Sequence, residues 1–108
     1  MQQGVVLMDS TNQSVVPLLR LYVAGATSRS TRAITTVRRF CERHLAGHYR
    51  LEIIDVYQQP DRAREDHIIA TPTLLIVEPG PPTAFIGELR SSDWPRVAAA
   101  LNLFPNDE

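Results

Sequence analysis

The sequence predicts an α/β sandwich, and three observations indicate this fold class. Short runs of apolar and β-branched residues recur along the chain, each long enough for a strand. Between the first two runs, apolar side chains return every three or four positions, the spacing of an amphipathic helix. Pro72 stands directly before the third run, at the start of a strand, where a proline is tolerated. The 108 residues are enough for one domain with its own core.

The first half of the chain predicts a strand, a long helix and a second strand. These elements are expected over residues 18–24, 31–46 and 51–56, in that order. The first run is almost continuously apolar, which is typical of a central strand. Ser28 or Ser30 is expected to cap the helix, and Gly47 to end it. A strand, a helix and a strand in this order predict parallel neighbours joined by a right-handed crossover.

The second half predicts a short helix, two strands and a closing helix. They are expected over residues 60–69, 73–78, 83–87 and about 94–101. Pro60 begins the short helix at the first-turn position that proline favours. Only Ala63, Ile68 and Ile69 anchor this helix, and Ser92 or Asp93 is expected to cap the last one. The complete order of elements is therefore βαβαββα.

Composition excludes several classes of function. The net charge of −1 does not favour nucleic acid or an anionic membrane surface, and the apolar runs are far shorter than a membrane-spanning helix. The polar start of the chain does not resemble a signal peptide, so the cytoplasm is the expected location. The predicted organisation is a flexible N-terminal extension over residues 1–17, a domain over 18–104 and a short tail over 105–108.

The segment Thr71-Pro72-Thr73, together with the order of elements, resembles the thioredoxin fold, but the dithiol chemistry of thioredoxins is missing. A dithiol exchange site needs two cysteines close together, and this chain has only Cys41. Cys41 lies on the apolar side of the first helix and is expected to be a buried hydrophobic residue. The histidines lack the ligand spacing of a metal site, so neither a metal nor a cofactor is expected.

Several segments are similar, in order and at nearly fixed spacing, to the KaiB family of circadian clock proteins. They are Leu21–Gly25, Ile54–Val56, Ala70–Leu74 and Ile86-Gly87, with Arg32-Ala33 and Glu65-Asp66 between them. The similarity spans residues 18 to 103. It implies a non-enzymatic adaptor that binds a KaiC-type ATPase ring and modulates circadian timing or related signalling.

The same resemblance implies partners, states and contact positions. The implied partners are a KaiC-type ATPase, a KaiA-like protein and a sensor-kinase domain. The implied behaviour is metamorphic: a βαββααβ ground fold, often tetrameric, converts to a thioredoxin-like form that is a monomer or dimer and binds KaiC. The implied partner contacts are Arg32, Arg38, Arg39, Gln58, Ala63, Asp66, Ala100 and Asn102, and the fold-determining prolines are Pro60 and Pro72.

The chain departs from the clock pattern in its C-terminal segment. Residues 98–103 contain three alanines where the family typically has Leu-Ile-Gly. Glycine in a helix costs roughly 0.8–1.0 kcal/mol relative to alanine, so the segment favours the thioredoxin-like form, in which it is helical. Gln58 replaces a family lysine, and Thr83-Ala84 replaces an arginine pair. These changes suggest a homologue outside the core oscillator.

The sequence leaves alternatives open for the arginines of the first helix, for Trp94 and for the class of function. The arginines of the first helix are either a solvated face balanced by Glu42 and Glu52, or a docking surface for an acidic partner. Asp55 is expected to be a structural cap, and Trp94 is either a cover for the core or an interface anchor. The second functional class is a thioredoxin-fold redox protein or monothiol transferase without the cysteine pair, which would need Ser28 or Ser30 to be reactive.

Overall fold

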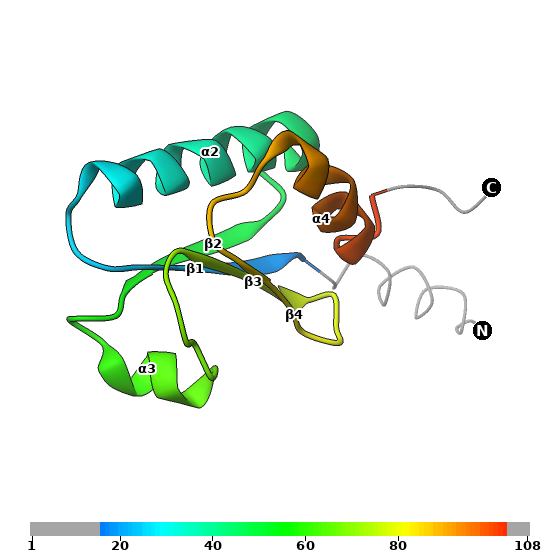
Figure 1. Cartoon of the computed structure of the whole chain (residues 1–108). Helices are drawn as coiled ribbons and strands as arrows, with labels where there is room; N and C mark the ends of the chain where they lie inside the picture. Colours follow the sequence, from blue (N-terminus) through cyan, green and yellow to red (C-terminus); the bar gives the residue numbers. More distant parts are fainter. Residues whose placement is uncertain (1–15, 104–108) are drawn as a thin grey trace, which may run out of the picture.

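The computed structural model describes residues 16–103 as a four-stranded sheet with helices on both faces (Figure 1). The strand order is β2-β1-β3-β4, with β1 parallel to β2 and the other two pairs antiparallel. The predicted thioredoxin-like α/β sandwich and the parallel first pair are therefore confirmed. Residues 1–15 of the predicted extension over 1–17, and the whole predicted tail over 105–108, lie outside the described residues.

The elements follow the predicted order βαβαββα, with one added turn. The strands are β1 (Leu18–Val23), β2 (Arg50–Asp55), β3 (Thr73–Glu78) and β4 (Thr83–Ile86). The helices are α2 (Ser28–Leu45), α3 (Pro60–Glu65) and α4 (Trp94–Ala100), and a 3₁₀ turn over Ser91–Asp93 precedes α4. Figure 1 shows α2 and α4 on one face of the sheet and α3 on the other.

Alternation along β1 supplies a core to each face of the sheet. Leu19, Leu21 and Val23 pack with residues of α2 and α4 in the larger core. Tyr22 points to the opposite face, where it forms a smaller core with Ile54 and Leu75 between the sheet and α3. The small helix thus has an apolar support of its own, although none of its residues is fully buried.

Helix α2 begins and ends close to the predicted positions, but different residues make its caps. Thr27, and not Ser28 or Ser30, is the N-cap, because its hydroxyl accepts the backbone N–H of Ser30 at 3.1 Å. At the other end Ala46 already has a left-handed backbone, φ +40°, before Gly47 at φ +79°. The predicted stop at Gly47 is therefore preceded by a strained alanine.

Helix α3 is shorter than predicted: it ends at Glu65, whereas the sequence predicted an end at Ile69. His67 has φ +57°, and the N–H groups of His67 and Ile68 donate to the carbonyls of Arg64 and Ala63, which is the pattern of a Schellman motif. Ala63 and Ile68 pack on the small core as predicted. The prediction for Ile69 was wrong, since it is 83% exposed.

Helix α4 ends in the same motif. Asn102 has φ +59°, and the N–H groups of Asn102 and Leu103 donate to Ala99 and Ala98. The alanines of residues 98–100 are helical, as their propensity predicts. Asp93 stands at the predicted cap position, but its carboxylate accepts the backbone N–H of Arg90 at 2.7 Å.

Candidate partner-binding surface

The residues implied as partner contacts lie on both faces of the sheet and do not form one patch. Arg32, Arg38 and Arg39 are exposed on α2. Gln58 is exposed in the turn after β2, on the way to α3 on the opposite face. The others belong to helix ends: Ala63 and Asp66 to α3, Ala100 and Asn102 to α4.

The basic side of α2 divides into a paired and an unpaired part. At its start, Arg29 and Arg32 both contact Glu88 of the loop after β4, at 3.2 and 3.0 Å. Farther along, three exposed arginines have no carboxylate partner within residues 16–103: Arg38, Arg39 and Arg43.

The expected balance of this face by Glu42 and Glu52 holds for Glu42, which lies beside Arg38, Arg39 and Arg43, but not for Glu52. Glu42 accepts the hydroxyl of Tyr49, and this hydrogen bond raises the pKa of Tyr49 to about 12. Glu52 pairs with Arg20 and Arg62 on the α3 side of the sheet. Glu42 keeps its negative charge on α2, so only the compensation expected from Glu52 is missing from this face.

Next to these arginines lies an aromatic pair. The rings of Phe40 and Trp94 stack with centroids 4.5 Å apart, and the centroid of the His44 ring lies 4.6 Å from that of Phe40. Trp94 is half-buried and packs on the larger core. The side chains of Arg39 and Arg43 line a shallow pocket with these rings. Tryptophan and arginine are enriched among the residues that contribute most to binding at protein interfaces.

A polar network fastens α3 to the sheet on the opposite face. Arg20 donates to Glu52 at 2.8 Å and to Asp66 at 3.1 Å, and Arg62 donates to Glu52 at 2.8 Å. The hydroxyl of Tyr22 donates to the same carboxylate of Asp66. Asp66 is thus committed to contacts within the chain, with only 19% of its side chain exposed.

The network shifts pKa values among its members, and Glu52 and Tyr22 illustrate the two directions. The hydrogen bond from Arg62, and secondly that from Arg20, holds the pKa of Glu52 below its ordinary value. Burial and the hydrogen bond to Asp66 raise the pKa of Tyr22. Both shifts favour the protonation states present at neutral pH, so the network is structural.

The turn where thioredoxins carry their reactive thiols is occupied by capping hydroxyls. Thr27 accepts from the backbone of Ser30, and the Ser30 hydroxyl donates to the carbonyl of Ala24 at 3.4 Å. Cys41 is fully buried in the middle of α2, and burial raises the pKa of its thiol to about 11. Its expected role as a buried hydrophobic residue is confirmed.

Asp55 and Pro72 complete this end of the molecule. The carboxylate of Asp55 accepts the backbone N–H groups of Gly25 at 3.1 Å and Tyr57 at 2.9 Å, which confirms its structural role. Pro72 is buried behind a cis peptide bond, and its carbonyl accepts the N–H of Gly87 at 2.8 Å.

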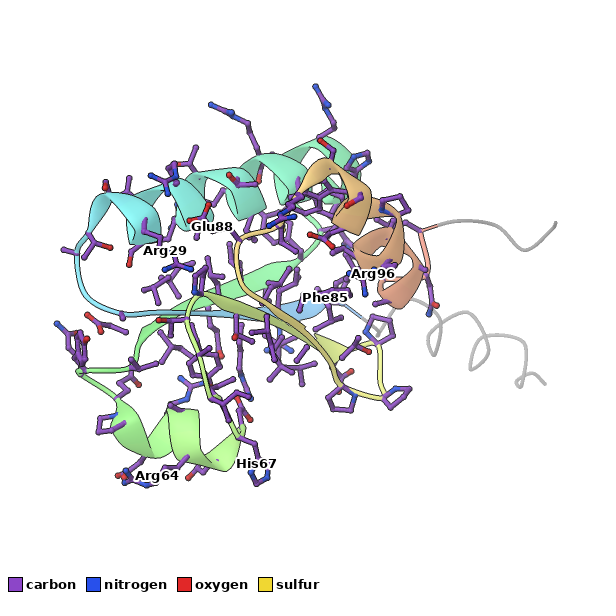
Figure 2. All side chains as sticks on the ribbon, viewed as in Figure 1. Arg29, Arg64, His67, Phe85, Glu88 and Arg96 are labelled. Atoms are coloured by element: carbon purple, nitrogen blue, oxygen red, sulfur yellow. The ribbon has the colours of Figure 1, made fainter. Side chains whose placement is uncertain are left out.

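A cavity below the paired arginines was not predicted from the sequence. It has a volume of about 160 Å³ and lies between α2, Pro72 and the loop after β4, with Arg32 and Glu88 in its wall. Figure 2 shows Arg29 and Glu88 close together beside α2. Since 56 positions separate Arg32 from Glu88, no local pattern signals the pair.

Two further classes of site have no counterpart in the described part of the chain. Among residues 16–103, no three histidine, cysteine or carboxylate side chains gather as metal ligands do. In the same range, no helix combines the length and apolar character needed to cross a membrane.

Comparisons with solved structures give the fold. The chain superposes on the N-terminal domain of SasA from Synechococcus elongatus with a TM-score of 0.72 at 19% identity, covering 88% of this chain and 90% of that one. It superposes on chloroplastic thioredoxin z with a TM-score of 0.65 at 18% identity, covering 94% and 91%.

Comparisons of sequence give the family. The KaiB domain model matches residues 20–99. The circadian clock oscillator protein KaiB of a Synechococcus species is 48% identical over 86 residues, which cover 80% of this chain and 76% of the relative. The circadian clock protein KaiB3 of a Synechocystis species is 40% identical over 88 residues, covering 82% and 84%. This chain, a thioredoxin-like sandwich without a cysteine pair, therefore belongs to the KaiB family of circadian clock proteins.

Proposed function

We propose that this chain is a non-enzymatic adaptor of the cytoplasm that binds a KaiC-type ATPase ring and modulates circadian timing or related signalling. The observation that carries the proposal is family membership, combined with the lack of a reactive thiol at the turn before α2. The hydroxyls of Thr27 and Ser30 are engaged as caps, and Cys41 is buried. Such a molecule can act by contact and not by thiol exchange.

The experiment is a pull-down with the KaiC-type ATPase of the same host, run with ATP and with ADP. Recovery of the ATPase by the chain is the expected result. A disulfide reductase and a glutathione transferase assay form the second arm. Turnover in either assay would support the redox alternative and contradict the adaptor.

The unpaired arginines of α2 support a second contact, with an acidic surface of a KaiA-like or sensor-kinase partner. Arg38 and Arg39 are exposed, without a carboxylate partner in the described part of the chain, and Arg39 lines the pocket beside the Phe40–Trp94 stack. The double change Arg38→Glu and Arg39→Glu is expected to weaken that contact at least tenfold in a titration. Unchanged affinity would leave α2 as a solvated face.

Fold switching is part of the same proposal. The thioredoxin-like form, a monomer or dimer, is the form proposed to bind the ring. A tetrameric βαββααβ form is the proposed ground state from which it arises. The helical propensity of Ala98–Ala100 and the network between α3 and the sheet support the first form. Size-exclusion chromatography with light scattering, run over a concentration series, tests for the tetramer.

A further inference from the structure

The cavity beside Pro72 has the size of a single apolar side chain. Its volume of about 160 Å³ lies between α2 and the loop after β4, and much of its wall is apolar, formed by Leu21, Val37, Leu74 and Leu89. Protein interiors rarely leave such a space unfilled. An apolar cavity of about 150 Å³ holds benzene, whereas drug-sized ligands need roughly 300 Å³ or more. The occupant is therefore small and apolar.

The rim of this cavity is charged and exposed. The Arg32 and Glu88 side chains line it, and they are 62% and 44% exposed. Arg29, 58% exposed, contacts the same Glu88 oxygen as Arg32 does. Two guanidinium groups thus share one carboxylate oxygen, although each carries five N–H donors. The rim keeps a net positive charge and donors for a second carboxylate.

We propose that the cavity receives one apolar side chain of a partner protein, and that an acidic residue next to it in the partner binds Arg29 and Arg32. The proposal deepens the proposed adaptor function and rests on it. Size selects an aliphatic or single-ring anchor, and the two guanidinium groups select against a basic neighbour. Carboxylate binding by arginine adds direction to an otherwise non-directional apolar contact.

Glu88 has an opposite effect to the arginines in this arrangement. Its carboxylate already accepts from Arg32 and forms an ion pair with Arg29, so it competes with the partner's carboxylate. Removing the charge of Glu88 should therefore strengthen binding, while removing that of Arg32 should weaken it. This opposition of signs distinguishes a shared anion site from a general electrostatic attraction.

The test uses dipeptide probes and amide chemical shifts of the full chain. N-acetyl-Leu-Glu-amide and N-acetyl-Leu-Gln-amide are titrated into the protein in separate experiments. The second probe keeps the apolar leucine and lacks the negative charge. We expect saturable shifts centred on Ala33, Leu74 and Gly87, and at least threefold tighter binding of the acidic probe. Glu88→Gln should tighten that probe at least twofold, and Arg32→Gln should abolish its advantage. Arg64→Gln, on the opposite face of the sheet (Figure 2), is the matched control and should change nothing.

Other outcomes overturn the proposal. Shifts that do not saturate, that centre elsewhere, or that persist unchanged in Glu88→Gln and Arg32→Gln would exclude this site. Tighter binding of 4-methylpentanoate than of the dipeptide would assign the cavity to a free acid. These variants change exposed side chains, so the test does not depend on a core substitution.

The ATPase ring separates this inference from the proposed function. If the chain binds the ring and the two variants bind it equally well, the cavity is not the contact, while the adaptor function stands. If the acidic probe binds the cavity but the ring is not recovered, the adaptor function fails for this ring, while the binding site stands.

Discussion

At the scale of single residues, Asp66 joins α3 to the sheet. Its carboxylate accepts from Arg20 at 3.1 Å and from the hydroxyl of Tyr22. Asp66→Asn removes the charge and should lower the free energy of unfolding by about 1.5–3 kcal/mol, the range for hydrogen bonds to charged groups. Urea unfolding followed by the fluorescence of the single tryptophan measures the loss.

Asp61→Asn is the matched control for this change. Asp61 lies in the same helix and pairs with Arg64, but its side chain is 80% exposed. Exposed ion pairs and first-turn charges contribute little, so the loss should stay below about 1 kcal/mol. Equal losses in the two variants would mean that the helix, and not the network, responds to removal of the charge.

Glu52 gives the network a dependence on pH with a defined sign. The hydrogen bonds from Arg62 and Arg20 lower its pKa in the folded chain relative to the unfolded chain. A lowered carboxyl pKa contributes stability above its ordinary value, about 4.3, and loses it as pH falls through the folded value. The difference in urea midpoint between the wild type and Glu52→Gln should therefore be largest at pH 7 and shrink below about pH 4.

A constant difference from pH 7 to pH 3 would contradict this prediction. It would mean that the glutamine loses a contact that is independent of charge. Arg62→Gln provides a second check, because it removes the main cause of the lowered pKa at Glu52. In this variant the acid sensitivity assigned to Glu52 should be weaker than in the wild type.

At the scale of elements, the end of α2 contains a correctable strain. Ala46 adopts φ +40°, where an L-residue with a β-carbon costs roughly 1–2 kcal/mol. Ala46→Gly should raise stability by about 1 kcal/mol, or about 4–8 °C in melting temperature for a domain of this size. Arg43→Gly, three positions earlier and helical, should lower stability by about 1 kcal/mol. Losses in both variants would rule out strain at Ala46.

Local patterns predicted the elements well where one signal acted alone. The apolar spacing of α2 and the continuous run of β1 placed both correctly, because α2 is buried along one side and β1 on both faces of the sheet. The N-cap is Thr27 and not the predicted Ser28 or Ser30, because several hydroxyl residues in this turn could serve as the cap. Helix α3 ends earlier than predicted because His67 takes a left-handed conformation. This conformation is usually signalled in a sequence by glycine, and the position holds a histidine.

At the scale of the whole molecule, the candidate site depends on contacts that local patterns do not contain. Arg20 reaches Glu52 and Asp66 across 32 and 46 positions of the chain, and Arg32 reaches Glu88 across 56. Family resemblance supplied candidate positions, but the sheet separates them onto two faces. Which of these positions contact a partner depends on how they are arranged on the folded surface. The cavity below Arg32 is formed by residues distant in sequence, so local patterns could not predict it.

The proposed balance between two folds would also be a property of the whole molecule, and changes at the end of α4 should shift it. Ala99→Ile with Ala100→Gly restores the family's residues and costs the helix about 1.4 kcal/mol, a factor of about ten in any equilibrium with a non-helical state. Ala99 is exposed, so the isoleucine adds no clash in the core. We expect a second, slowly exchanging set of amide signals with strand-like carbon shifts for residues 98–103.

Ala99→Leu is the control, because leucine keeps the helical preference and adds a side chain of similar size. It should give one set of signals. A double variant that also gives one set, with helical shifts and a lower urea midpoint, would contradict switching. The lost helical preference would then favour only the unfolded chain, and α4 would be an ordinary helix without an alternative partner in the sheet.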